Sequence, residues 1–461
     1  MYDVIIIGAG PGGIFSAYEL MKQDENLKIA VFDAGRSLEQ RHCPIDGEKV
    51  KSCIGCKTCA IMNGFGGAGA FSDGKYNITN DFGGTLYEYI GRQKALELMK
   101  YVDTINMSHG GEGTKMYSTA GTDLKKVCLQ NKLKLLDASV RHLGTDVNYV
   151  VLKNLYDEMK DHMDFFFDTP VEKIQVKEDG YLVSTKDAEY ACKKCIVSVG
   201  RSGSKWMETV CEDLEIPTKS NRVDIGVRVE VRDEVMDFLN KNLYEAKLVY
   251  HTPTFDDKVR TFCTNPSGEV ATEYYDGGLA VVNGHAYKSM DMKTNNTNFA
   301  LLVSKNFTKP FKTPIEYGKQ IAQLSNMLCD GKIMVQTFGD FRRGRRTTEE
   351  RLCRNNLIPT LKDAVPGDLS LVLPHRIMVD IAEMIEALDK VTPGIASDET
   401  LLYGVEVKFY SNKVVVNREF ETNVKGLRAM GDGASVTRGL QQASANGLSV
   451  ARSIINKSKA E

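Results

Sequence analysis

Hydrophobic positions at the start of the chain follow the pattern of a buried strand, then of a helix, then of a second strand. Residues 2–7 form a nearly continuous apolar run, typical of a strand buried on both faces of a parallel sheet. A glycine-rich turn at residues 8–13 follows, and residues 14–21 carry apolar side chains at helical spacing. A second apolar run at residues 28–32 ends in Asp33. This order predicts a βαβ unit.

The rest of the chain alternates between helical and strand patterns. Helical periodicity dominates residues 85–160, and apolar–polar alternation typical of strands dominates residues 222–285. More strands are predicted within residues 165–200 and at 426–430, and a terminal helix at 441–456. The other individual helices are predicted at 92–101, 147–161, 315–329 and 375–389.

Composition and charge narrow the class of protein. The 59 Lys and Arg residues nearly balance the 61 Asp and Glu residues, which argues against a nucleic-acid partner because such binders usually carry a basic excess. No apolar run reaches the roughly 20 residues that a membrane-spanning helix needs. The early Asp3 and the short apolar run after it are unlike an export signal. We therefore expect a cytoplasmic enzyme.

The turn at residues 8–13 has the glycine spacing of a dinucleotide-binding motif. Gly8 permits the tight turn, Gly10 lets the backbone approach a pyrophosphate, and Gly13 lets the helix pack closely on the strand. Free N–H groups at the helix N-terminus attract the phosphates. Asp33 is placed to accept hydrogen bonds from a ribose. Together these features predict a dinucleotide site.

The same glycine spacing recurs at residues 64–69, but its surroundings differ. A cysteine-rich segment precedes it instead of a buried strand, and no helical pattern follows. We interpret it as a glycine-rich loop. Since no second complete motif is found, the sequence predicts no separate domain for NAD(P).

Four of the eleven cysteines crowd into a short segment, and their spacing leaves three interpretations open. The C-x2-C-x2-C core suits a [4Fe–4S] cluster with a fourth thiolate from nearby, and zinc can use the same thiolates. A redox-active dithiol, formed by the second and third or by the third and fourth of these cysteines, is the other interpretation. The four residues are Cys43, Cys53, Cys56 and Cys59.

Three separated segments resemble the flavoproteins that bind FAD on a glutathione-reductase-like Rossmann domain. They are residues 8–33, the strand end at Val199 and Gly200, and residues 427–434. The last segment resembles the second FAD motif of that superfamily. The resemblance implies that Asp432 holds the ribityl hydroxyls of FAD.

A narrower resemblance extends over nearly the whole chain. Residues 64–75, 141–146, 340–348 and 433–440 are similar to a poorly characterised family of FAD-dependent dehydrogenases. The similarity implies FAD but no substrate. The contacts with FAD that these resemblances imply are Gly8, Gly10, Pro11, Gly12, Gly13, Asp33, Ala34, Gly35, Arg36, Gly67, Ala68, Ser72, Val171, Gly200, Arg201, Gly431, Asp432, Gly433, Gly439 and Leu440.

Three residues are candidates for catalysis. Lys75, at the end of the glycine-rich loop, can stabilise negative charge on a flavin, and His142 can transfer a proton. Arg343 lies in a run of four arginines between residues 342 and 346, which can clamp a carboxylate or phosphate. The alternatives are a solvated lysine, a structural histidine and a solvated arginine turn.

The resulting fold prediction is α/β with two domains. A Rossmann-like FAD-binding domain of three-layer β/β/α character is expected from residues 1–85, 160–220 and 395–461. An inserted α+β substrate domain with a mixed or antiparallel sheet is expected from residues 86–159 and 221–394. A chain of 461 residues is long enough for both.

The functional prediction is an FAD-dependent oxidoreductase, either a dehydrogenase or a reductase. It would transfer a hydride or an electron pair between the flavin and a small organic substrate, which the arginine run suggests is anionic. NAD(P)H or a ferredoxin-like protein would supply electrons. An FAD-dependent monooxygenase and a flavin-dependent tRNA-modifying protein are the alternatives.

Overall fold

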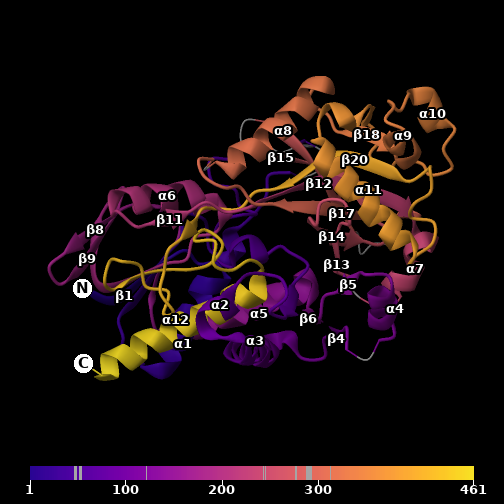
Figure 1. The fold of residues 1–461 in the computed structure, drawn as a ribbon. Coiled ribbons are helices and arrows are strands. Elements are labelled where there is room, and N and C mark those ends of the chain that lie inside the picture. Colours follow the sequence, from indigo (N-terminus) through magenta and orange to yellow (C-terminus); the bar gives the residue numbers. More distant parts are fainter. Residues whose placement is uncertain are drawn as a thin grey trace. The chain divides into compact units, whose positions relative to one another are not determined.

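The chain folds into two compact units (Figure 1). Unit 1 comprises Met1–Ser118, Ala138–Lys219 and Ser411–Glu461, and unit 2 comprises Thr119–Asp137 and Ser220–Tyr410. This computed structural model describes residues 1–45, 49–50, 54–120, 122–241, 243, 246–275, 278–286, 293–311 and 313–460.

The division into units differs from the domains expected from the sequence in two segments. Residues 395–410 were assigned to the FAD-binding domain but belong to unit 2. Residues 86–159 were assigned to the inserted domain, yet all of them except Thr119–Asp137 belong to unit 1. Two helices of that segment, α3 (Arg92–Asn106) and α5 (Gly144–Met159), add apolar side chains to the core of unit 1, so burial keeps them there.

Unit 1 is built on a seven-stranded sheet in the order β7-β2-β1-β10-β9-β8, with β22 also beside β10. The strands β7, β2, β1, β10 and β22 are parallel, while β8, β9 and β10 form an antiparallel meander. Their bounds are β1 Tyr2–Ile7, β2 Ile29–Phe32, β7 Asp164–Phe166, β8 Val171–Lys177, β9 Gly180–Thr185, β10 Glu189–Val197 and β22 Leu427–Ala429.

Strand β10 belongs to two layers because its two halves have different neighbours. Residues 189–192 pair with β9, whereas residues 195–197 pair with β22, and β1 lies along its other edge. The meander thus diverges from the parallel sheet. With helices packed on the parallel strands, this gives the predicted three-layer β/β/α character.

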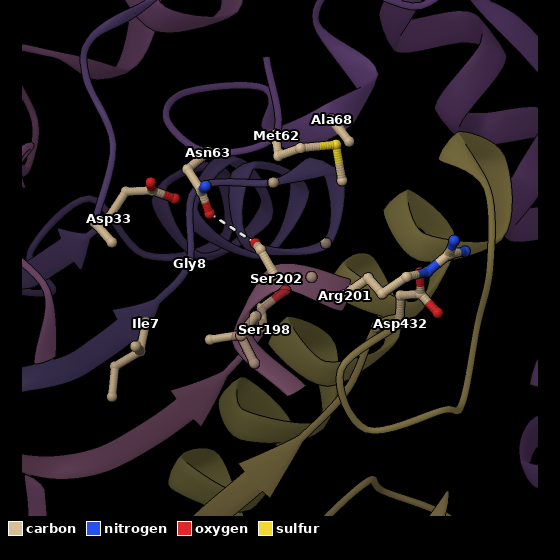
Figure 2. A pocket seen from close by; sticks show the side chains of 18 of the residues that line it. Ile7, Gly8, Asp33, Met62, Asn63, Ala68, Ser198, Arg201, Ser202 and Asp432 are labelled. Atoms are coloured by element: carbon tan, nitrogen blue, oxygen red, sulfur yellow. Dashed lines mark hydrogen bonds and ion pairs between the residues drawn. The ribbon is translucent and has the colours of Figure 1, made fainter. Parts of the chain in front are cut away.

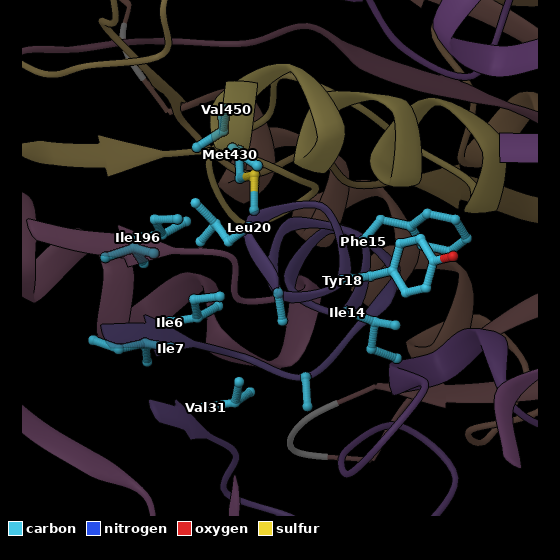
Figure 3. Close-up of a cluster of buried hydrophobic side chains, with 14 of the residues drawn as sticks. Ile6, Ile7, Ile14, Phe15, Tyr18, Leu20, Val31, Ile196, Met430 and Val450 are labelled. Carbon is cyan, nitrogen blue, oxygen red and sulfur yellow. The ribbon is translucent and has the colours of Figure 1, made fainter. Parts of the chain in front are cut away.

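Helices α1 (Pro11–Gln23) and α12 (Leu440–Ala460) pack closely against each other. A Cβ atom on Gly447 would lie 2.2 Å from the carbonyl oxygen of Gly12, so only glycine permits this approach. The hydroxyl of Ser16 donates to the carbonyl of Gly447 at 3.0 Å. Figure 3 shows apolar side chains of α1, including Leu20, between the sheet and α12, together with Met430 from the segment after β22.

Sequence periodicity was wrong about part of residues 85–160. The helices α3 and α5 confirm the two strongest helical predictions, but a three-stranded sheet, β3-β6-β4, also draws on this segment. Its strands are short and partly exposed, so they carry little apolar alternation. The remaining elements of unit 1 are β3 Lys75–Ile78, α2 Leu86–Ile90, β4 Met116–Ser118, β6 Ser139–His142, α6 Ser204–Asp213, β11 Thr218–Lys219 and β21 Lys413–Val414.

Unit 2 contains an eight-stranded sheet in the order β19-β18-β20-β12-β17-β14-β13-β5. Its neighbours are antiparallel except for β18 and β19, so the sheet is mixed, as predicted. A hairpin, β15 (Glu269–Tyr275) and β16 (Leu279–His285), also contacts β20. The sheet strands are β5 Lys134–Leu135, β12 Val223–Arg232, β13 Leu248–His251, β14 Lys258–Asn265, β17 Asn296–Lys305, β18 Met334–Thr337, β19 Val365–Pro366 and β20 Leu401–Lys408.

The two faces of this sheet differ in chemistry. Alternate residues of β12 from Val223 onward are apolar and belong to a core that includes side chains of two long helices. The other face of β12 carries charged residues that are also fully buried, such as Arg228, which pairs with Glu406 at 2.8 Å. The helices of unit 2 are α4 Leu124–Gln130, α7 Asp233–Asn240, α8 Pro314–Leu328, α9 Phe338–Arg342, α10 Glu349–Cys353 and α11 His375–Asp389.

Within the described part of the chain, no helix combines the length and apolar character needed to cross a bilayer.

A carboxylate pair fastens the β13–β14 turn to α11. Asp380 is fully buried and accepts a hydrogen bond from the Thr252 hydroxyl at 2.8 Å. Burial is the main cause that raises the pKa of Asp380 to about 6, and the nearby Asp257 contributes to the same effect. Arg376 and Lys305 bind Asp257 and lower its pKa to about 2, against the effect of its own burial. The folded state therefore favours a protonated Asp380 beside an ionised Asp257.

Because the pKa of Asp380 is higher in the folded state, its protonated side chain stabilises the folded protein. This stabilisation is fully present below about pH 4 and is lost as the pH rises through about 6. Asp380→Asn keeps the acceptor for Thr252 but cannot ionise, so we expect it to gain roughly 1–3 kcal/mol relative to wild type between pH 4 and 7. Thermal unfolding followed by circular dichroism at several pH values measures this. The exposed Asp256→Asn variant is the control, and an equal change in both variants would contradict the assignment.

Candidate functional site

A pocket of about 480 Å³ opens in unit 1 at the carboxyl ends of β1, β2 and β10 (Figure 2). This volume lies within the range of typical small-molecule sites. The turn before α1, the end of β2, the glycine-rich loop, the segment after β10 and the segment after β22 all contribute to its wall. The ends of parallel strands are where open α/β sheets usually bind their ligands.

Two glycines of the first turn are required by the fold itself. Gly8 has a φ of +106°, and a Cβ atom there would lie 2.5 Å from the carbonyl oxygen of Ser198. A Cβ on Gly13 would lie 1.9 Å from the carbonyl oxygen of Gly8. These contacts agree with the predicted roles of Gly8 in the turn and Gly13 in close packing.

Two other glycines that line the pocket have no such structural need. Gly10 has φ −76° and ψ −178°, and Gly200 has φ −82° and ψ −165°, which any residue can adopt. A Cβ atom at either position would meet no protein atom within 4 Å and would project into open space. The absence of side chains therefore leaves room for a ligand that approaches the backbone closely.

The carboxylate of Asp33 joins three segments of the wall. It accepts hydrogen bonds from the backbone N–H groups of Ala9, Gly35 and Gly64, each at 2.8 Å. A carboxylate has about four acceptor sites, so the oxygen that binds Ala9 keeps one more. Asp33 thus shapes the pocket and retains capacity for one hydroxyl donor.

Arg41 binds the backbone of the glycine-rich loop and of the residues just before it. Its buried guanidinium donates to the carbonyls of Ala60, Ile61, Phe65 and Gly67 at 2.6–2.9 Å. Burial lowers the pKa of Arg41 to about 10, although nearby acidic groups oppose this effect. Nothing in the local sequence indicates this role, because the four carbonyls lie about 20 residues further along the chain.

The C-terminal segment closes the other end of the pocket. Gly431 has a φ of +77°, and the N–H of Gly433 donates to the carbonyl of Val199 at 2.9 Å. Asp432 lines the pocket 3.5 Å from the guanidinium of Arg201. A negative and a positive side chain therefore stand together at this end, as Figure 2 shows.

A hydrogen bond joins opposite sides of the pocket. The amide oxygen of Asn63 accepts from the hydroxyl of Ser202 at 2.7 Å, and both side chains line the pocket (Figure 2). The amide nitrogen of Asn63 donates to the carbonyl of Cys59 at 3.3 Å. Trp206, the single tryptophan of the chain, lines the same pocket. Sequence reasoning missed these three lining residues, since they belong to no recognised motif.

The pocket brings together most of the positions expected to contact FAD. Five of them lie outside its lining. Gly13 and Gly433 pack against backbone atoms, and the N–H of Gly35 donates to Asp33. Arg36 pairs with Asp168 at 3.7 Å, and the Ser72 hydroxyl donates to the carbonyl of Gly69 at 2.7 Å. The expected positions that line it are Gly8, Gly10, Pro11, Gly12, Asp33, Ala34, Gly67, Ala68, Val171, Gly200, Arg201, Gly431, Asp432, Gly439 and Leu440.

The three catalytic candidates lie outside the lining of this pocket. Lys75 and His142 are directly opposite each other on β3 and β6, and Lys75 pairs with Asp73 at 2.8 Å. Arg343 belongs to unit 2, where it binds Asp398 at 2.6 Å. The structure thus brings Lys75 and His142 together, and it pairs Arg343 with Asp398, which Arg342 also binds.

The clustered cysteines are only partly described. Cys53 lies outside the described residues, Cys43 and Cys56 are exposed, and Cys59 is half-buried. Among the residues that the structure describes, no group of three or more His, Cys, Asp or Glu side chains is arranged to hold a metal ion. The carbonyl of Cys59 accepts from the N–H groups of Met62 and Asn63, so this segment leads directly into the pocket wall.

Comparison with known families identifies part of the chain. Residues 222–409, within unit 2, match the family described as "FAD-dependent protein, C-terminal domain-like". An uncharacterized protein of Clostridium beijerinckii (strain ATCC 51743 / NCIMB 8052) is 27% identical over 480 residues, covering 98% of this chain and 80% of that protein.

Two solved structures show a weaker similarity. Glycine oxidase from Geobacillus kaustophilus is 11% identical with a TM-score of 0.40, covering 99% of this chain and 95% of that one. Glycerol-3-phosphate dehydrogenase from Bacillus halodurans, complexed with FAD, is 10% identical with a TM-score of 0.38. The similarity covers 100% of this chain and 65% of that one. The family match over residues 222–409 is to FAD-dependent proteins.

The contrast between Gly10 and Gly13 predicts different outcomes for the same substitution. Gly10→Ala should fold normally but place a methyl group in ligand space, weakening FAD binding roughly 10-fold to 100-fold. Gly13→Ala should disrupt folding, because its Cβ would overlap the backbone of Gly8. Quenching of Trp206 fluorescence by added FAD measures affinity, and circular dichroism measures folding. Wild-type affinity in Gly10→Ala would show that the ligand does not approach this face.

Proposed function

We propose that unit 1 binds FAD in this pocket and that the protein is an oxidoreductase that exchanges a hydride or an electron pair with a small organic substrate. The observation that carries the proposal is the open space beside Gly10 and Gly200, which have ordinary backbone conformations and no packing reason to be glycine. The family match of residues 222–409 supports the choice of FAD over another dinucleotide.

Each end of the pocket suits a different part of FAD. The pyrophosphate would lie against Gly10 and the N-terminus of α1, where free N–H groups stabilise negative charge. The remaining acceptor site of Asp33 would take one ribose hydroxyl of the adenosine. Asp432 would accept from the ribityl hydroxyls, with Arg201 holding its carboxylate in place.

FAD would supply the redox chemistry, and the protein would bind and orient it. Arg41 binds two carbonyls of the glycine-rich loop, those of Phe65 and Gly67, so this loop would present a positioned wall to the cofactor. For Lys75 and His142 to transfer a proton, the substrate would have to reach the β3–β6 sheet, where the two residues are cross-strand neighbours.

Two electron partners are compatible with the proposal. NAD(P)H can reduce a flavin without a dinucleotide domain of its own if it docks transiently, and a ferredoxin-like protein can deliver single electrons. The second route would use an iron–sulfur cluster at Cys43, Cys53, Cys56 and Cys59. Iron and sulfide analysis of anaerobically purified protein separates the two, since only the second requires about four irons per chain.

The proposal predicts flavin absorbance at about 375 and 450 nm in the purified protein, after reconstitution with FAD where this is necessary. Anaerobic titration with NADH, NADPH and dithionite should bleach the band near 450 nm, and a substrate screen then asks which compounds restore or bleach it. Asp432→Ala, which removes the ribityl acceptor, should bind FAD more weakly by roughly 1.5–3 kcal/mol. Failure of wild-type protein to bind FAD under any of these conditions would refute the proposed function.

The bond between Asn63 and Ser202 predicts a kinetic effect on cofactor exchange. If it spans the pocket in both the free and the loaded protein, Ser202→Ala should speed FAD association and release alike, about fivefold for the loss of about 1 kcal/mol, with little change in Kd. Stopped-flow quenching of Trp206 measures both rates.

A matched control and a double variant make this test specific. Ser453→Ala, on α12, removes a hydroxyl that donates to a carbonyl of its own helix and should leave both rates unchanged. Asn63→Ala combined with Ser202→Ala should have no larger effect than either alone. Faster release with unchanged association would instead show that Ser202 contacts the cofactor directly.

A further inference from the structure

A group of cations gathers on the polar face of the sheet in unit 2. Arg260 on β14 reaches across the intervening strand β17 and binds the carboxylate of Asp224 on β12. Its guanidinium also donates to the hydroxyl of Tyr410 at 2.8 Å. Arg222, just before β12, lies 3.7 Å from the other oxygen of Asp224.

Sheet register brings a third cation to the same face. Lys258 and Arg260 are two residues apart on β14, so their side chains project from one face. The pairing of Val259 with Val303 places Lys258 beside Ser304 of β17, and Ser304 pairs with Asp224. Lys258 therefore occupies the row of the sheet that contains Asp224.

Positive charge exceeds negative charge in this group. Asp224 is fully buried and lies among Arg222, Lys258 and Arg260, so one carboxylate faces three cations. Burial lowers the pKa of Lys258, and repulsion from Arg260, Arg222 and Lys134 lowers it further, with Asp224 opposing. A lysine destabilised by like charges is the electrostatic signature of an uncompensated positive site.

Donor groups in the cluster are also left over. The Nε atoms of both Arg222 and Arg260 are shielded from solvent, and within the described residues neither has a hydrogen-bond partner. The Arg260 side chain is only 13% exposed. Buried guanidinium donors normally find acceptors, because leaving one unpaired costs about 1–3 kcal/mol. The Nε of Arg222 faces Oδ1 of Asp224, which also lacks a hydrogen-bond partner among the described residues. An anionic oxygen would satisfy the Nε of Arg260 and the excess positive charge together.

We propose that Arg222, Lys258 and Arg260 form a binding site for the carboxylate or phosphate group of a small molecule. The run of arginines at residues 342–346 is less suited, since Arg342 and Arg343 share Asp398, and Arg345 binds Asp340. The anion site stands on its own geometry. That the bound molecule is the substrate of the flavoenzyme rests on the proposed function.

Titration of the full-length protein tests the site with two probes at constant ionic strength. Inorganic phosphate and acetate represent the two chemistries, and isothermal titration calorimetry measures their Kd. Wild-type protein should bind at least one probe. Lys258→Gln and Arg222→Gln should each weaken that binding about tenfold, the effect of losing one charge-assisted hydrogen bond. Neither variant removes the Arg260–Asp224 pair, so both should fold.

A lysine elsewhere on unit 2 provides the control for net charge. Lys241 is 72% exposed and pairs with Asp237 on α7, so Lys241→Gln makes the same change of charge away from the cluster. Its Kd should equal that of wild type. Binding of phosphate alone or acetate alone supports the site and assigns its chemistry. No binding of either probe, or equal weakening in Lys241→Gln, overturns the proposal.

Flavin absorbance of the same samples separates this inference from the proposed function. Lys258→Gln and Arg222→Gln should keep the wild-type FAD content, because neither residue belongs to the pocket of unit 1. Anion binding without FAD would refute the flavoenzyme and leave the anion site intact. FAD binding without anion binding would refute the anion site and leave the proposed flavoenzyme intact.

Discussion

The pocket of unit 1 depends on the hydrogen bonds that the carboxylate of Asp33 accepts. By accepting N–H groups from Ala9, Gly35 and Gly64, this carboxylate fixes the first turn, the end of β2 and the glycine-rich loop relative to one another. Charge-assisted hydrogen bonds of this kind are about twice as strong as neutral ones. Arg41 holds the same loop from its other side, so an anion and a cation from neighbouring segments together define one wall.

The sequence predicts those parts of the pocket that come from consecutive elements. It does not predict the residues that only tertiary folding brings together. The βαβ unit is confirmed because its turn, helix and strands are consecutive and each has its own periodicity. Asn63, Ser202 and Trp206 meet at the pocket only through tertiary folding, so no spacing indicates them. The strands β17 and β20 were missed because they are buried on both faces and lack clear alternation.

Burial explains a further difference between pattern and structure. The alternation along β12 correctly predicts a strand, yet polar positions of an alternating strand usually face water. Here Asp224, Arg228 and Glu230 are as fully buried as the valines between them. Arg228 is compatible with burial because Glu406 and Asn298 satisfy its guanidinium. Whether a polar face is covered depends on segments elsewhere in the chain, such as the β15–β16 hairpin.

The divided pairing of β10 sets an order of events during synthesis on the ribosome. Its second half pairs with β22, and α1 packs against α12, yet β22 and α12 emerge more than 200 residues after β10. Ser220–Tyr410, the larger segment of unit 2, leaves the ribosome in that interval. The second half of β10 must therefore wait with one edge unpaired, and α1 with one face uncovered. Unpaired strand edges and uncovered apolar faces favour aggregation of a growing chain.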